Sequence, residues 1–267
     1  MQTGRPIAGA LSRVPAIILC GGKGSRLQPL TGDHIPKALV RVGELTLLDH
    51  TLQLLRRNGM RRAILATSHH SDQIRQHVEN MGNGTLEITI SQTEQPLGVV
   101  PSVITAFSQF ALDSTFLLAG ADEICEGLDL EAVYRFHQTK SSMATIVLTS
   151  HIVSEYSSLK AAIDGHGSIT SIARGTPISE YTATGIAFLE PGFLTRALQI
   201  EQAEAAAPES LLNVLLPKLI AEKRLHGMVC SMKRYMHIST PEAYQAACFT
   251  LSAQYATNMP LVGTVID

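Results

Sequence analysis

Three glycines and two basic residues stand together near the start of the chain. The run from Leu19 to Leu27 reads Leu-Cys-Gly-Gly-Lys-Gly-Ser-Arg-Leu and follows an apolar segment, Ala16 to Cys20. Glycine lets a backbone approach a ligand closely, and the N–H groups of such a loop can bind phosphate oxygens. Lys23 and Arg26 add the positive charge that an anion requires. The pattern indicates either a phosphate-binding loop or a tight strand-to-helix turn without a ligand.

The loop differs from two common phosphate-binding motifs. Gly24 follows Lys23 where a P-loop has Ser or Thr, and Leu27 stands where the dinucleotide fingerprint has its third glycine. A further basic segment, Pro36-Lys37-Ala38-Leu39-Val40, comes shortly after. Any anionic ligand must be met by such local charge, because the 267 residues carry a formal net charge of only −2. That balance argues against a broad nucleic-acid surface.

Elements that could position these residues alternate along the first half. Apolar runs predict strands, and apolar residues at helical spacing predict helices between them, which favours a mostly parallel sheet covered on both faces. The expected strands are 16–20, 62–67, 86–90, 116–119 and 144–148, and the expected helices are one ending at Gly59, one capped by Ser71 and Asp72, 99–110 and 129–137. The second half predicts a hairpin of 159–163 and 169–173, a strand at 184–189, helices at 193–200 and 211–224 with a break at Pro217, and a last helix opening at Thr240-Pro241.

From Ile18 to Val42 the sequence resembles the sugar nucleotidyltransferases. Their opening pattern is an apolar strand, GGxG[ST]RLxPLT and then PKxLxxV, and the match here is almost unbroken. With weaker similarities included, the resemblance covers roughly residues 15–247. The weaker segments are Glu94-Gln95-Pro96-Leu97-Gly98, the strand ending at Asp122, Thr182 to Ile186, Leu216 to Leu219, and Ile238 to Tyr244. The resemblance implies a Rossmann-like three-layer α/β/α fold with a mixed, mostly parallel sheet and a small β-rich insertion on the sugar side.

The resemblance also implies a reaction. A sugar 1-phosphate, or a related cyclitol phosphate, attacks the α-phosphorus of a nucleoside triphosphate and pyrophosphate leaves, which positioning and electrostatics can promote without a protein nucleophile. Arg26 would bind the leaving phosphates, Lys37 would bridge the reacting phosphates, and Asp122 would hold Mg²⁺. The implied nucleotide-binding residues are Leu19, Gly21, Gly22, Gly24, Ser25, Gln92 and Gly98, and Gly185 is the implied sugar-binding residue.

Two departures from the family pattern bear on substrate and metal. His237 stands where the family has a second metal-binding aspartate, and imidazole suits Mn²⁺ better than Mg²⁺. Arg174 stands where the family has a carboxylate for sugar hydroxyls, which argues against glucose 1-phosphate as the acceptor.

Two functions therefore stay open, and a third agrees poorly with the sequence. The intact triphosphate half favours an active nucleotidyltransferase with an unusual acceptor. The departures at His237 and 174–177 favour a non-catalytic homologue that binds a nucleotide or nucleotide sugar and regulates a partner. A metal-dependent glycosyltransferase agrees poorly, because Ala121-Asp122-Glu123 supplies one suitably spaced aspartate rather than Asp-x-Asp.

The chain as a whole predicts one nucleotidyltransferase domain at 15–257, after a loose extension at 1–14 and before a tail at 258–267. The cysteines Cys20, Cys125, Cys230 and Cys248 are widely spaced, which favours a reduced, cytoplasmic setting. No apolar run is long enough to cross a bilayer, and we expect no membrane partner. The oligomeric state stays open, with a homo-oligomer compatible with the sequence.

Overall fold

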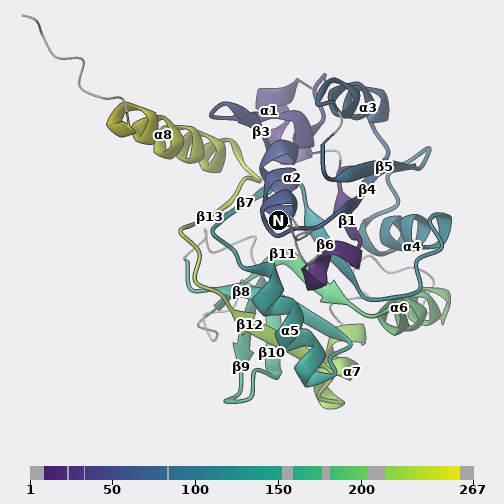
Figure 1. Ribbon diagram of the computed structural model, residues 1–267. Coiled ribbons are helices and arrows are strands. Elements are labelled where there is room, and N and C mark those ends of the chain that lie inside the picture. The colour runs from purple at the N-terminus through teal and green to yellow at the C-terminus, as the bar shows by residue number, and fades with distance from the viewer. Residues whose placement is uncertain are drawn as a thin grey trace, which may run out of the picture.

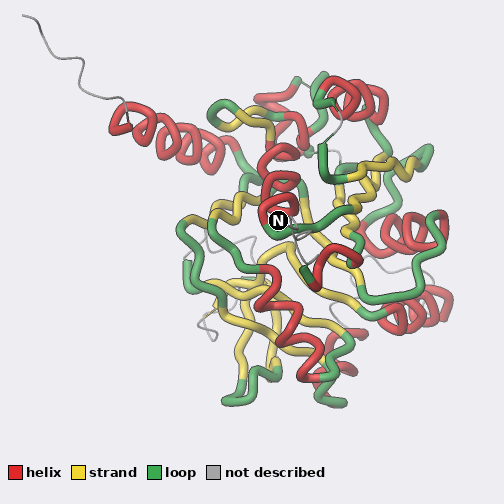
Figure 2. The backbone as a smooth tube through the Cα atoms, in the orientation of Figure 1, coloured by secondary structure: helices red, strands yellow, loops and turns green. Residues whose placement is uncertain are grey.

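A computed structural model describes residues 9–22, 24–32, 34–82, 84–151, 159–175, 181–203 and 214–258. Strands lie at the centre of the molecule and helices on its outside (Figure 2). The strands of the main sheet are β1 (Ala16–Leu19), β4 (Arg62–Thr67), β5 (Glu87–Gln92), β6 (Phe116–Gly120), β8 (Ala144–Thr149), β9 (Leu159–Ile163), β10 (Ile169–Arg174), β11 (Tyr181–Leu189) and β12 (Leu225–Val229).

The sheet is mixed. Its main order is β10-β9-β11-β6-β1-β4-β5, and β8 also pairs with β11 and carries β12 on its other edge. The pairs β6-β1, β1-β4, β4-β5 and β8-β12 are parallel. The antiparallel strand β11 joins these two parallel groups by pairing with both β6 and β8. The sequence prediction of a mixed, mostly parallel sheet is confirmed.

Helices cover both faces of the sheet (Figure 1). The longer ones are α2 (Leu47–Arg57), α3 (Ser71–Asn80), α4 (Val99–Gln109), α5 (Leu130–Lys140), α6 (Pro191–Ala203) and α8 (Pro241–Asn258). Neighbouring residues of β1 show the layering, because side chains alternate between the faces of a strand. Ile18 packs in a cluster with Leu52 of α2, whereas Ile17 packs with Val103 of α4. Both isoleucines are fully buried, which explains the unbroken apolar run.

Short elements complete the chain and connect the layers. They are the 3₁₀ turns η1 (Ala10–Arg13), η2 (Ser25–Leu27) and η3 (Lys37–Leu39), the helices α1 (Gln28–Thr31) and α7 (Leu216–Ala221), the hairpin β2 (Arg41–Val42) and β3 (Leu45–Thr46), and the pair β7 (Glu123–Glu126) and β13 (Arg234–His237). The structure orders more of the N-terminus than the sequence indicated. In the expected loose extension, Leu11 and Val14 are buried in the core.

One predicted helix cap is confirmed and another is not. Thr240 accepts a hydrogen bond from the backbone N–H of Ala243, as expected at the start of the last helix. Asp129, expected as the first residue of its helix, caps α5 by accepting from the backbone N–H of Ala132. The predicted cap of α3 by Ser71 and Asp72 is wrong, because the helix starts after His70, which has a left-handed backbone. The hydroxyl of Ser71 bonds the hydroxyl of Thr67 at 3.1 Å instead.

The region around Pro217 agrees with the prediction in part. A helix over 211–224 with a break at Pro217 was expected; in the described residues a π-helical turn at Val214 and Leu215 leads into α7, which ends at Ala221, and Pro217 lies in the first turn of α7. Proline is tolerated there, because the first N–H groups of a helix have no partner within the helix. Residues 211–213 lie outside the described part of the chain.

Candidate active site

The predicted nucleotide-binding residues meet at one edge of the sheet. Strands β1, β4, β5 and β6 run parallel, so their carboxyl ends lie at the same edge. Leu19 ends β1 there and Gln92 ends β5. In open α/β sheets this edge is where ligands bind. Gln92 and Gly98 are both exposed, so neither is committed to the core.

The three glycines of the first loop have different reasons to be glycine. A Cβ on Gly21 would lie 2.8 Å from Oγ of Ser68, whose hydroxyl donates to the Gly21 carbonyl. Gly24 has φ +61°, and a Cβ there would lie 3.1 Å from Cβ of Lys37. A Cβ on Gly22 would meet no described atom within 4 Å. Packing therefore explains Gly21 and Gly24, while Gly22 leaves an open approach to the backbone.

Two further loop residues face solvent. Ser25 and Arg26 are exposed at the start of η2, and among the described residues Arg26 has no ion-pair partner. A guanidinium without a protein partner is available to a phosphate, for which its geometry is suited. Lys23, the other basic residue of the loop, lies outside the described residues.

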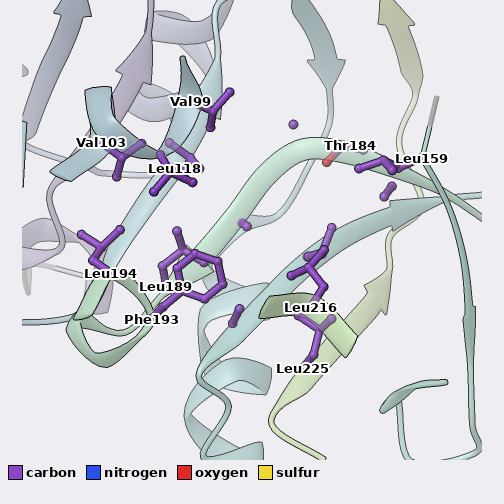
Figure 3. Close-up of a pocket in the computed structure, with 16 residues that line it drawn as sticks. Val99, Val103, Leu118, Leu159, Thr184, Leu189, Phe193, Leu194, Leu216 and Leu225 are labelled. Carbon is purple, nitrogen blue, oxygen red and sulfur yellow. The ribbon is translucent and has the colours of Figure 1, made fainter. Parts of the chain in front are cut away.

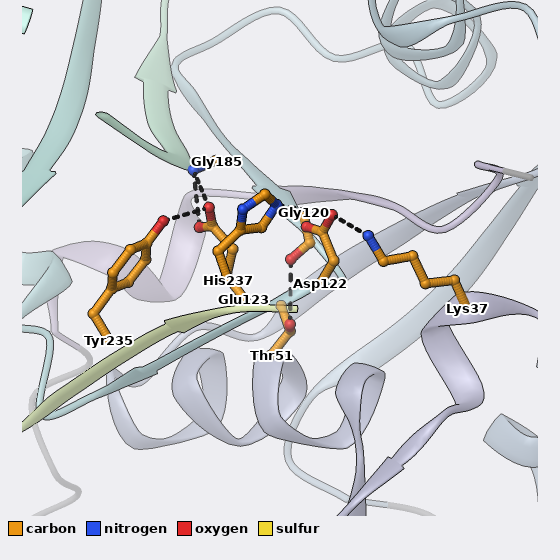
Figure 4. A network of polar contacts seen from close by, with 8 residues as sticks. All are labelled: Lys37, Thr51, Gly120, Asp122, Glu123, Gly185, Tyr235 and His237. Carbon is orange, nitrogen blue, oxygen red and sulfur yellow. Dashed lines mark hydrogen bonds and ion pairs between the residues drawn. The ribbon is translucent and has the colours of Figure 1, made fainter. Parts of the chain in front are cut away.

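Lys37 and Asp122 form the central ion pair of the site (Figure 4). Nζ of Lys37 lies 2.7 Å from Oδ2 of Asp122, and Nε2 of His237 lies 3.6 Å from the same oxygen. Burial raises the pKa of Asp122, but His237 and the positive charge of Lys37 outweigh burial and hold that pKa well below its ordinary value. Asp122 is therefore a carboxylate at neutral pH, with the Lys37 ammonium and the His237 imidazole beside it.

Glu123 forms a second polar cluster on the other side of the same turn. Its carboxylate accepts hydrogen bonds from the Gly185 amide at 2.8 and 2.9 Å and from the Tyr235 hydroxyl at 2.8 Å (Figure 4). Glu123 is 7% exposed. Burial raises its pKa to about 7, and the charge of Asp122 adds to this, while His237, Tyr235 and Gly185 act in the opposite direction.

Glu123 is the site residue that the sequence analysis missed. It gives a carboxylate in contact with Gly185, the residue that the family resemblance assigns to the sugar. The apolar pair Ile124-Cys125 that follows could have indicated that Glu123 is buried. It could not have indicated which hydrogen-bond partners Glu123 has. Arg174, at the end of β10, is exposed, and 176–180 lies outside the described residues.

One carboxylate of the site could hold a divalent cation. Within the described residues there is no cluster of three or more His, Cys, Asp or Glu side chains that could hold a metal. Oδ2 of Asp122 is engaged by Lys37, which leaves Oδ1 for an ion. Mg²⁺ is commonly held by one or two carboxylates together with substrate phosphates, so the residues present are compatible with an ion that arrives with a nucleotide.

The sequence profile of the nucleotidyl transferase family matches residues 15–252. The chain belongs to this family. Among curated proteins, this nucleotidyl transferase is 28% identical to the mannose-1-phosphate guanylyltransferase catalytic subunit beta of Drosophila melanogaster, over 98% of the chain and 69% of that protein. It is 26% identical to the glucose-1-phosphate adenylyltransferase of Leifsonia xyli, over 78% of the chain and 47% of that protein.

Solved structures show the same architecture. The nucleotidyl transferase chain superimposes on HddC from Yersinia pseudotuberculosis complexed with GMP-PN with a TM-score of 0.69, at 21% identity, over 89% of this chain and 99% of the other. In the described part of the chain no helix is both long and apolar enough to span a membrane. The Rossmann-like fold expected from the family resemblance is confirmed.

Proposed function

We propose that the protein is a nucleotidyltransferase that joins a nucleoside triphosphate to a sugar 1-phosphate or a related cyclitol phosphate. The oxygen of the acceptor phosphate attacks the α-phosphorus, the bond to the β-phosphate oxygen breaks, and pyrophosphate leaves. The observation that carries this proposal is the 2.7 Å ion pair between Lys37 and Asp122 beside a glycine loop whose arginine has no ion-pair partner among the described residues. Each of these groups has a role that the reaction requires.

Lys37 and Arg26 supply positive charge to reactants that are both anions. In the absence of substrate Lys37 is neutralised by Asp122, so its ammonium stays next to the carboxylate until phosphates arrive. Arg26 then holds the β- and γ-phosphates that form the leaving group. The backbone at Gly22 is open to the phosphates, whereas Gly21 and Gly24 keep the loop close to Ser68 and Lys37.

Asp122 would hold Mg²⁺ through the oxygen that Lys37 leaves free, in concert with the substrate phosphates. When bound, such an ion neutralises charge that develops on the phosphates. His237 would supply a nitrogen ligand near the same carboxylate, and we expect Mn²⁺ to be accepted for that reason.

A protein nucleophile is not needed, and the nearest thiol is poorly suited to be one. Cys20 follows β1 directly before the loop, and burial, followed by the charge of Asp122, raises its pKa well above the ordinary value. The group is therefore a neutral thiol at physiological pH, and thiols react as nucleophiles through their thiolate form. Direct attack by the acceptor phosphate is the step that the site favours.

Pyrophosphate release tests the proposal. The protein is incubated with each common NTP or dTTP, Mg²⁺ or Mn²⁺, and a panel of sugar and cyclitol 1-phosphates. We expect release that requires one NTP and one acceptor, is abolished by EDTA and is lost in Lys37→Ala. Lys233→Ala is the matched control, because Lys233 is 64% exposed and pairs with Glu126 at the surface. Turnover in Lys37→Ala equal to wild type would contradict the assigned role.

The second candidate is a non-catalytic nucleotide-binding homologue, which His237 in place of a family aspartate favours. Calorimetry distinguishes the two. An NTP that binds without turnover across the acceptor panel supports the binding protein, and absence of both binding and turnover contradicts both candidates.

A further inference from the structure

An apolar cavity of about 150 Å³ lies between the sheet and the helices α4, α6 and α7 (Figure 3). Its floor is one row of the sheet, because Ala187 of β11 is the register partner of both Leu118 in β6 and Ile146 in β8. All three floor residues are partly exposed although they belong to central strands. The small side chain of Ala187 in the middle of this row leaves the space above it unfilled.

The described walls of the cavity offer almost no polar group. Val103, Phe193 and Leu216 stand above the floor from the three helices (Figure 3). Thr184 is the one described lining residue with a polar side chain, and its hydroxyl accepts a hydrogen bond from the Ile186 amide. An apolar cavity of this size has room for a small hydrocarbon group.

The cavity is continuous with the residues assigned to the two substrates. Gly185 lines it, as does Val99, which follows Gly98 at the start of α4. The Gly185 amide, which the family resemblance assigns to the sugar, is already bonded to Glu123. Arg174 replaces the family carboxylate for sugar hydroxyls. Among the described residues on the acceptor side, Glu123 and Tyr235 bond each other, and the cavity adds a surface that recognises carbon.

We propose that this cavity binds an apolar part of the acceptor, so that the substrate is a deoxygenated or alkyl-substituted sugar or cyclitol phosphate. This inference rests on the proposed function and names its substrate class. A hydroxyl placed among these side chains would lose its hydrogen bonds to water without a replacement, which disfavours it by about tenfold or more. Each buried methylene favours binding by about fourfold.

Pairs of 1-phosphates that differ by one hydroxyl test the preference directly. Mannose 1-phosphate is compared with its 6-deoxy analogue, and glucose 1-phosphate with its 6-deoxy analogue, by kcat/KM with the preferred NTP. We expect at least one deoxy compound to be preferred over its parent by tenfold or more. Equal or better use of both hydroxylated parents overturns the proposal while leaving the nucleotidyltransferase function intact.

A cavity-filling variant assigns the preference to this cavity. Ala187→Leu puts carbon into the space above the floor, and we expect the deoxy preference to fall to about one while the Kd for NTP stays unchanged. Ala246→Leu, on the exposed side of α8, is the matched control. A preference that persists in folded Ala187→Leu contradicts the proposal.

A binding measurement covers the case in which Ala187→Leu does not fold. Methyl, propyl and pentyl phosphate are titrated into the wild-type protein in the presence of NTP. We expect affinity to rise about fourfold per methylene until the cavity is full. Affinity for the alkyl phosphates that is independent of their chain length overturns the proposal. If NTP itself does not bind to the protein, the proposed function is wrong instead.

Discussion

Gly120 leaves the space that the carboxylate of Asp122 occupies. A Cβ on residue 120 would lie 2.6 Å from Oδ1 of Asp122, closer than real Cβ atoms approach a neighbour. The last residue of β6 is therefore glycine because of a side chain two positions later.

We predict that Gly120→Ala lowers kcat for pyrophosphate release by about 100-fold, because a displacement of about 1 Å in an active site has effects of that size. The fold should persist, since φ of Gly120 is not in the left-handed region. Gly192→Ala is the control, because a Cβ there would make an ordinary contact of 3.6 Å with Met143. Equal kcat in the two variants would show that Asp122 tolerates the change.

The bonds to Glu123 predict an ordered pair of stability effects. Tyr235→Phe removes one donor and should lower the free energy of unfolding by about 1 kcal/mol. Glu123→Ala leaves both the Tyr235 hydroxyl and the Gly185 amide without their acceptor, and should cost about 3 kcal/mol. Urea unfolding measures both. The double variant should lose less free energy of unfolding than the sum of the losses in the two single variants. A loss equal to that sum would mean that the hydroxyl and the carboxylate act independently.

Asn58 joins two helices that contribute to the same side of the sheet. Its amide donates to the carbonyls of Leu54 at 2.9 Å and Leu128 at 3.1 Å, and its oxygen accepts from the Leu130 amide at 2.9 Å. Asn58→Ala should therefore lower the free energy of unfolding by about 2 kcal/mol, seen as a lower Tm. The exposed Asn80→Ala should change it by less than about 0.5 kcal/mol. Similar Tm values for the two variants would argue against this bridge.

His137 predicts how stability depends on pH. Nε2 lies 2.9 Å from the Glu190 carboxylate and Nδ1 lies 2.8 Å from the Thr145 hydroxyl. Since a carboxylate only accepts, the neutral ring donates through Nε2 and accepts through Nδ1. Burial lowers the pKa of His137, although Glu190 acts in the opposite direction.

Because the folded pKa is depressed, the unfolded chain binds a proton at His137 that the folded chain does not. The stabilisation is complete above the unfolded pKa of about 6.5 and is lost as pH falls below it. His137 therefore lowers the free energy of unfolding as pH falls from 7 to 5, whereas Glu123, whose pKa is raised to about 7, acts in the opposite direction over the same range. His137→Gln should be less stable than wild type at pH 7, and its stability should fall less or rise more on acidification. Burial also lowers the pKa of His226, so part of the histidine contribution remains in the variant. An unchanged slope in His137→Gln would assign the effect to other groups.

Elements with local signals could be predicted from the sequence, and elements held by distant partners could not. The strand at Ala16–Leu19 is continuously apolar, and the side chain of Asp129 caps its helix by accepting a hydrogen bond from the backbone N–H three residues later. In contrast β7 and β13 have polar ends and pair with each other across more than a hundred residues of chain. The strand β12 contains Gly227, and a glycine in the sequence is more typical of a turn than of a strand. A Cβ there would lie 2.5 Å from Cδ1 of Leu148, so packing explains the glycine.

The same distinction holds in the site. The family motifs placed Lys37 and Asp122 in one site, and the structure brings their side chains together at 2.7 Å. The contact between Glu123 and Gly185 depends on how β7, β11 and β13 converge, which no local pattern records. The roles of the predicted binding residues remain predictions for the experiments above.

In the described chain β11 is the one strand that joins the sheet around the glycine loop to the sheet around the cavity. It meets β6 along three registered residues, Ala187, Phe188 and Leu189. Because this contact between β11 and β6 is short, substitutions in β8, β9, β10 and β12 leave the register of β1, β4 and β5 unchanged. The half that we propose for the acceptor can therefore diversify during evolution while the half that we propose for the nucleotide keeps its register.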